Sequence, residues 1–258
     1  SSASVLFVRC QNYHSQITFA NGWTNNGKVL LTSTTGYQAA MAISAGTLVN
    51  AAGAQLVCGG VPNGYGYNQI NGGVNNQGDM NIGYTLRIYS TPASSANTGT
   101  LNFTSGAALY FYSGTFHWNG GTATGNGLLG FEGATGSFNT AVMPSIPTYF
   151  DNATFASTIA GISNAKSITL NYNNTISANV TNTDTVFVDH YNNSWNGSMT
   201  TSPASVLLIR CQNYHSQVTF ANGWTNNGKI LLTSSTGYQP AFTVTTGTLL
   251  NATTGLIR

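Results

Sequence analysis

The sequence predicts an all-β protein, and two observations support that prediction. Short runs rich in Val, Ile, Thr, Tyr and Phe recur along the chain and are separated by turns rich in Gly, Asn and Ser. Side chains within such a run alternate between two faces, as in residues 84–89, where Leu86 and Ile88 share one face. Residues 153–162 are the one helix candidate, and Gly161 weakens it.

Strand-like runs occur along the whole chain, at residues 5–9, 16–19, 28–32, 84–89, 101–103, 108–112, 167–171 and 185–189. Their irregular spacing favours an antiparallel β-sandwich or jelly roll. A parallel β-solenoid is the alternative, and it ranks second because the sequence shows no short period. Residues 59–83, rich in Gly and Asn, are interpreted as a long loop.

A long internal repeat organises the chain. Residues 1–50 align without gaps with residues 202–251, and 37 of the 50 positions are identical. This predicts one full unit over 1–201, which could contain two β subdomains of about 1–100 and 101–201, and the start of a second unit over 202–258. A partial unit cannot bury its own apolar face, so we expect a further stretch of chain or a neighbouring molecule to complete it. The alternative is a repeated set of strands that closes a single monomer.

Charge is scarce. Only 5% of the residues are charged, against about 25% in an average protein. The seven Lys and Arg are scattered, which argues against nucleic acid and against a polybasic membrane anchor. No run approaches the roughly 20 apolar residues of a membrane span. We expect a secreted, extracellular protein from which any signal peptide has been removed.

Attached glycans would explain how a surface with so few charged residues stays hydrated and soluble. The N-x-S/T sequons lie at Asn102, Asn152, Asn173, Asn179, Asn192, Asn196 and Asn251. A chain this rich in Asn, Ser and Thr acquires some sequons by chance. We nevertheless expect at least two to be occupied.

The three cysteines suggest one disulfide per repeat. Cys211 is the counterpart of Cys10, and the counterpart of Cys58 would fall at position 259, just past the last residue given. We therefore predict a Cys10–Cys58 disulfide, with Cys211 bonded to a partner outside this stretch of chain. Two alternatives are a Cys211–Cys58 bond and three buried thiols.

The sequence offers little catalytic chemistry, so we expect no enzyme, no cofactor and no metal site. Its whole stock of carboxylates is Asp79, Glu132, Asp151, Asp184 and Asp189. The adjacent Asp189 and His190 resemble part of a triad, but the nucleophile elbow is absent. His14 and its repeat counterpart His215 are interpreted as hydrogen-bonded structural residues.

Trp23 and its counterpart Trp224 are candidates for a carbohydrate-binding platform, because lectin sites combine an aromatic ring with Asn, Asp and Gln. The competing interpretation is that each tryptophan anchors a turn.

In composition and repetition the chain resembles secreted, glycosylated fibre and surface-appendage proteins of microbes. The resemblance implies a structural subunit of an extracellular filament or array, assembled with copies of itself by strand donation or head-to-tail packing. The alternative function is a carbohydrate-binding adhesin or lectin-like module.

Overall fold

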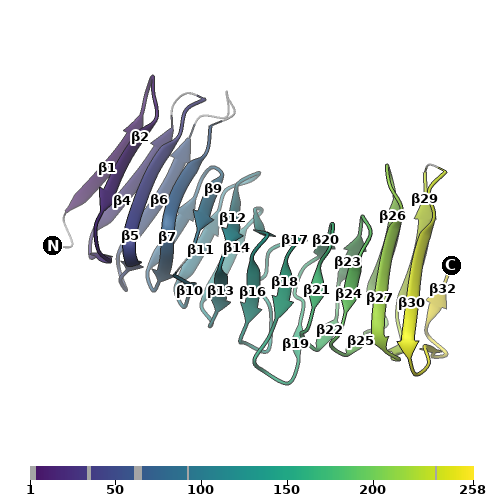
Figure 1. Cartoon of the computed structure of the whole chain (residues 1–258). Helices are drawn as coiled ribbons and strands as arrows, with labels where there is room; N and C mark the ends of the chain where they lie inside the picture. The colour runs from purple at the N-terminus through teal and green to yellow at the C-terminus, as the bar shows by residue number, and fades with distance from the viewer. Residues whose placement is uncertain (1–3, 34–35, 61–65, 92, 236) are drawn as a thin grey trace. The chain divides into compact units, whose positions relative to one another are not determined.

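The computed structural model describes residues 4–33, 36–60, 66–91, 93–235 and 237–258, which form strands and no helix (Figure 1). The all-β prediction is therefore confirmed. The strand pairings are parallel throughout the described residues, from the first, β1 with β4, to the last, β29 with β32. The chain is thus a parallel β-solenoid, and the antiparallel sandwich is wrong. The described residues contain no helix that could cross a membrane. Two compact units, Ser1–Ala134 and Thr135–Arg258, are described separately.

Unit 1 winds around three faces. The first face is a six-stranded sheet of β1 (Val5–Cys10), β4 (Lys28–Ser33), β6 (Gln55–Gly60), β8 (Asp79–Ile82), β11 (Thr100–Phe103) and β14 (Thr122–Gly125). The second contains β2 (Ser15–Phe19), the first parts of β5 (Ala39–Asn50) and β7 (Asn68–Asn76), β9 (Leu86–Tyr89), β12 (Ala108–Ser113) and β15 (Leu128–Glu132). The third contains β3 (Trp23–Asn25), the second parts of β5 and β7, β10 (Ser95–Asn97) and β13 (Thr115–Trp118).

Unit 2 follows the same plan. Its first face contains β17 (Thr148–Asp151), β20 (Ile168–Leu170), β23 (Thr185–Val188), β26 (Val206–Cys211), β29 (Lys229–Ser234) and β32 (Leu256–Ile257). Its second contains β16 (Thr135–Phe138), β18 (Thr154–Ala156), β21 (Thr175–Ile176), β24 (Asn193–Trp195), β27 (Ser216–Asn222) and β30 (Pro240–Thr246). Its third contains β19 (Ile162–Ser163), β22 (Val180–Asn182), β25 (Met199–Thr201), β28 (Thr225–Asn226) and β31 (Leu250–Asn251).

The coils differ in length, which explains why no short period is visible in the sequence. The first coil runs from Val5 to its partner Lys28, and the second, from Lys28 to its partner Gln55, is longer. In unit 2 the coil from Ile168 to its partner Val186 is shorter than either. The extra residues lie in the corners, where a longer loop leaves the strands in register. The repeated segment, residues 1–50 and 202–251, spans two coils in each copy.

Inward-facing residues stack in rows along each unit. In unit 1 the row that runs through Val8, Leu31, Cys58, Ile82 and Phe103 is buried throughout. Unit 2 has aromatic stacks in the same role, and the rings of its Phe residues 150 and 155 lie 5.1 Å apart at 12°. Burial of β-branched and aromatic side chains on one face of most strands is the main stabilising term of the fold.

A buried ladder of asparagines locks the corners of unit 1. Asn25 donates through its side-chain amide to Asn50, Asn50 to Asn76, and Asn76 to Asn97, over 2.8, 2.8 and 2.7 Å. Each amide also donates to a backbone carbonyl of the next coil, as Asn50 does to Asp79 at 3.1 Å. Every coil is thereby tied to its neighbour by side chains as well as by the backbone ladder.

Two local predictions need correction, and the position of residues 202–258 is now defined. The described part of residues 59–83 is not a loop, because it contains β7, β8 and the end of β6, while residues 61–65 lie outside the described part. Residues 153–162 contain β18 and the start of β19 and no helix. Residues 202–258 stack on the preceding coil through β26 and β27 and belong to unit 2, so one side of this partial repeat is covered by its own chain.

Candidate functional site

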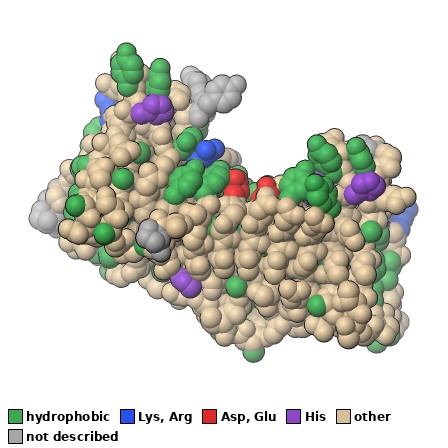
Figure 2. Space-filling model, in the orientation of Figure 1, with side chains coloured by type: hydrophobic (Ala, Val, Ile, Leu, Met, Phe, Trp, Pro, Cys, Tyr) green, Lys and Arg blue, Asp and Glu red, His purple; other side chains and the backbone are tan. Residues whose placement is uncertain are grey.

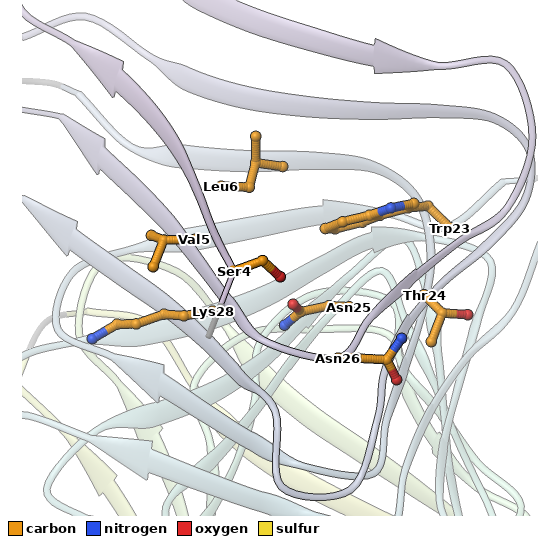
Figure 3. A pocket seen from close by; sticks show the side chains of 8 residues that line it. All are labelled: Ser4, Val5, Leu6, Trp23, Thr24, Asn25, Asn26 and Lys28. Atoms are coloured by element: carbon orange, nitrogen blue, oxygen red, sulfur yellow. The ribbon is translucent and has the colours of Figure 1, made fainter. Parts of the chain in front are cut away.

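The first coil of unit 1 has an open side. β1 is the terminal strand of its sheet. Beside it lies a pocket of about 240 Å³, formed by the start of β1, the corner between β3 and β4, and the indole of Trp23 (Figure 3). The side chains of Asn25 and Lys28 also line this pocket (Figure 3). We call this surface the N-terminal face.

Backbone donors point out of the N-terminal face. The amide of Lys28 donates to the carbonyl of Ser4 at 2.9 Å, and the alternation of a parallel ladder then directs the Val5 N–H away from β4. Val206, the repeat counterpart of Val5, donates to the carbonyl of Asp184 in the preceding coil at 2.9 Å. By analogy, the N–H of Val5 is oriented to donate to a backbone carbonyl of a coil packed against β1.

Side-chain burial gives the same comparison. In the second copy of the repeat, Val218 is 0% exposed and Trp224 is 7% exposed. Their counterparts Ile17 and Trp23 are only half-buried. The two copies are almost identical in sequence here, so the difference comes from the coil of residues 185–201, which covers only the second copy.

The last coil of unit 2 is open on its other side, and we call this surface the C-terminal face. Phe242 and Val244 are half-buried, whereas their counterparts Met41 and Ile43 are 0% and 6% exposed. Leu250 is 61% exposed. Each face thus presents apolar side chains beside an open strand edge.

The two tryptophans predicted as carbohydrate platforms differ in position. Trp224 is buried, so it cannot offer a ring face to a sugar, and that part of the prediction is wrong. Trp23 stacks on Phe19, with ring centroids 4.9 Å apart at 11°, and it also lines the pocket (Figure 3). Trp23 is better described as part of an open core than as a built ligand site.

We expect Trp23 to be the accessible member of the four tryptophans. Trp118, Trp195 and Trp224 are 3%, 0% and 7% exposed. Acrylamide should therefore quench about a quarter of the native tryptophan fluorescence, and Trp23→Phe should abolish most of that quenchable fraction. Quenching that Trp23→Phe leaves unchanged would show that another tryptophan is accessible.

The sequons lie mainly at coil corners. Asn152, Asn173 and Asn192 are exposed, with φ of 50°, 50° and 61°, and occupy equivalent corners of successive coils. Their amides are joined, since Asn192 donates to Asn173 at 3.1 Å and Asn173 to Asn152 at 2.7 Å. Asparagine tolerates this left-handed conformation better than most residues. The corner geometry therefore accounts for asparagine at these three sequons without a sugar.

The remaining sequons have varied surroundings. Asn102 lies half-buried in β11 and donates to Asn81 at 3.0 Å. Asn179 and Asn196 are exposed at a second corner, and Asn251 is exposed at the end of β31. The Asn179 amide donates to the carbonyl of Ala160 at 3.0 Å.

The cysteine prediction does not hold. Cys10 and Cys58 lie in β1 and β6, with β4 between them, and their sulfurs are not bonded. Strands two apart are separated by about 9–10 Å, and a disulfide needs Cα atoms about 4.4–6.8 Å apart. Cys211 is also a buried thiol, since its sulfur accepts a hydrogen bond from the Ser216 N–H at 3.2 Å. The alternative of three buried thiols is the one the structure supports.

Thiol reactivity provides a test. Burial raises the pKa of Cys58 to about 12, so its thiol stays neutral at pH 9, whereas an exposed thiol is mostly ionised there. We expect the native protein to react very slowly with an aromatic disulfide reagent at pH 9, and the unfolded protein to release three equivalents. Fewer than three equivalents without a reductant would indicate a disulfide.

Two of the polar residues considered for catalysis, Asp189 and His14, make structural contacts. Asp189 accepts two hydrogen bonds from the Arg210 guanidinium, at 2.5 and 2.8 Å. His14 accepts a backbone hydrogen bond at Nδ1 from Gln38, at 3.1 Å. Within the described residues, no three His, Cys, Asp or Glu side chains gather as a metal site would require.

Comparison with known proteins adds no relative. No family model, no curated protein and no solved structure matches this chain.

Proposed function

We propose that this protein is a structural subunit that assembles end to end through its two open solenoid faces, as part of a secreted extracellular filament or surface array. The observation behind the proposal is the contrast between the two copies of the repeat. The same residues are buried where a described coil precedes them and only half-buried in the first described coil. A second copy of the chain could cover that coil, as could a further stretch of the chain itself.

The edge strand of the N-terminal face, β1, contains no proline, whereas Pro240 begins β30 on the C-terminal face. Solenoids are normally closed by polar capping repeats, and open edges are blunted by Pro or inward-pointing charge. The described part of β1 instead exposes Val5 and Phe7, by 59% and 53%, beside its backbone donors. Parallel addition of a strand would satisfy those donors and cover the apolar side chains in part, since their counterparts Val206 and Leu208 are half-buried beside a neighbouring coil.

The asparagine ladder could continue across such a junction. Asn226 donates to Asn251 at 2.9 Å, and Asn251 in turn donates to the carbonyl of Gly255 within its own coil. The second amide hydrogen of Asn251 could then meet Asn25, which starts the ladder of unit 1. Head-to-tail contacts of this kind do not close on themselves and therefore generate filaments.

Glycans are part of the proposal. With 5% charged residues, the surface needs another source of hydration (Figure 2). Neighbouring strands are about 4.8 Å apart, which is too close for sugars on adjacent rows. Glycans can then sit on Asn152 and Asn192 together, or on Asn173 alone, but not on two adjacent members of this row. Intact mass before and after deglycosylation decides whether any sequon is used.

The resemblance to microbial surface fibres supports the same function, and we propose no catalytic role and no cofactor. The adhesin alternative is weakened in its original form, because Trp224 is buried.

A matched pair of proline variants tests end-to-end assembly. Val5→Pro removes an N–H that points out of the N-terminal face and sits at the first residue of an edge strand, where proline is tolerated. We expect Val5→Pro to keep the native unfolding midpoint but to stay monomeric in sedimentation at concentrations where the unmodified chain polymerises.

Val206→Pro is the control, because the same change there breaks the bond to Asp184. It should destabilise unit 2 by about 3 kcal/mol. Polymerisation of Val5→Pro equal to that of the unmodified chain would contradict the proposal.

A further inference from the structure

Aromatic rings form a continuous row on the outside of unit 2. They lie at the corners that follow β20, β23, β26 and β29, four strands that pair in that order. We call this row the tyrosine ridge, and its members are Tyr172, His190, Tyr191, Tyr214, His215 and Tyr238. Along the ridge, ring centroids are 3.9 Å apart from Tyr172 to His190, 5.4 Å from His190 to Tyr214 and 6.2 Å from Tyr214 to Tyr238.

The ridge is exposed. Tyr191, Tyr214 and Tyr238 are 40%, 49% and 39% exposed. In the space-filling view, hydrophobic side chains gather with a histidine over the upper ends of β26 and β29 (Figure 2). Exposed rings in this number are unusual for a surface whose other side chains are mostly small and polar.

The same arrangement occurs in unit 1. Tyr13 and Tyr37 have ring centroids 6.1 Å apart, as against 6.2 Å for Tyr214 and Tyr238, and Tyr13 is 78% exposed. In both copies the tyrosines are exposed, so packing in the core does not explain why tyrosine occupies these positions.

Polar groups with defined directions border the rings. His215 accepts the backbone N–H of Gln239 at Nδ1, at 3.1 Å, so its neutral form carries the proton on Nε2 and presents a donor. Asn173 and Asn192 directly follow Tyr172 and Tyr191 in the chain and are exposed. The ridge thus combines ring faces with amide, hydroxyl and imidazole groups.

The charged groups near the ridge are few, and Asp151 is the carboxylate that acts on both Tyr172 and His190. Asp189, beside His190, forms a two-bond ion pair with Arg210. The Arg210 guanidinium also lies 4.5 Å from the Phe187 ring. Among the described residues of the ridge corners, no Lys or Arg is left without a carboxylate partner to bind a phosphate or sulfate. The ridge therefore suits a neutral ligand.

We propose that the tyrosine ridge binds a neutral polysaccharide, which would lie along the row and cross several coils. The apolar faces of sugar rings would stack on the tyrosines, and their hydroxyls would hydrogen-bond to His215 and to the ridge asparagine that carries no glycan. This site is separate from the N-terminal and C-terminal faces, so binding does not require assembly.

Affinity electrophoresis of the full chain tests the proposal. Native gels would contain hydroxyethyl cellulose, xylan, galactomannan or soluble β-1,3-glucan, with dextran sulfate as the charged comparison and a polymer-free gel as reference. We expect at least one neutral polymer to retard the protein and dextran sulfate to have no such effect. Polymerisation would slow migration in the reference gel as well and is thereby separated from polysaccharide binding.

Two matched variants identify the rings as the cause. A chain with Tyr13, Tyr37 and the four ridge tyrosines, Tyr172, Tyr191, Tyr214 and Tyr238, all changed to Ala should bind the retarding polymer at least tenfold more weakly. The same six positions changed to Phe should retain binding within about threefold, since stacking needs the ring. Circular dichroism would confirm that both variants keep their strands. No retardation by any neutral polymer, equal binding by the Ala variant, or binding to dextran sulfate alone would overturn the proposal.

Discussion

Asn50→Leu should destabilise unit 1 by about 3 kcal/mol, because it interrupts the buried amide ladder. Asn50 is 0% exposed, receives a hydrogen bond from Asn25 and donates to Asn76. Leucine has a similar volume but no polar group, so the Asn76 amide oxygen would lose its donor inside the protein. Each buried polar atom left without a partner costs about 1–3 kcal/mol. Urea unfolding measures the change.

Asn26→Leu is the matched control at the same kind of corner. Asn26 is exposed, so the change should alter the free energy of unfolding by no more than about 0.5 kcal/mol. Equal effects at positions 26 and 50 would mean that the buried ladder contributes no specific stability.

Phe150→Ala should destabilise unit 2 by about 3–5 kcal/mol, the usual range for removing a large buried ring. Phe150 is 0% exposed, stacks on Phe155 and meets Phe138 edge-on at 6.5 Å. The coils here contain few residues, so little chain is available to collapse into the cavity. The thermal midpoint and the urea midpoint should both fall.

Phe7→Ala provides the comparison, since Phe7 is 53% exposed on an edge strand. Its effect on stability should stay within about 0.5 kcal/mol when measured on the monomer. A small loss for Phe150→Ala would indicate that the aromatic stack is loosely packed.

Strand positions could be predicted from the sequence, because alternation is a local property. The runs at residues 5–9 and 185–189, for example, correspond to β1 and β23. The direction of pairing is not local. Parallel pairing brings together strands one whole coil apart, and the coils differ in length because their corners differ, as the pairs Ile168–Val186 and Lys28–Gln55 show. That variation removed the short period on which a solenoid prediction would depend.

The candidate surfaces were only partly predictable. The repeat itself indicated an unfinished unit, and the contrast between Trp23 and Trp224 agrees with an exposed first coil. Of the two expected ways to cover residues 202–258, a further stretch of chain and a neighbouring molecule, the first applies on one side, where β23 and β24 pair with β26 and β27. Sequence reasoning missed the tyrosine ridge. Tyr172 and Tyr238 are far apart in the sequence, and only the stacking of the coils brings them into one row through Tyr214.

The interpretation of sequence motifs also changed with the structure. The sequons at Asn152 and Asn173 coincide with corners that favour asparagine in a left-handed conformation. The predicted Cys10–Cys58 disulfide was consistent with one disulfide per repeat, but β4 lies between the strands that carry the two cysteines. Both patterns arise from coil geometry.

Oriented fibre diffraction of concentrated protein tests the central claim most directly. If subunits join through their N-terminal and C-terminal faces, the strands lie across the filament. Their spacing of about 4.8 Å must then appear as a reflection along the filament axis. Filaments with that reflection perpendicular to the axis, or a protein that remains monomeric at every concentration, would contradict end-to-end assembly.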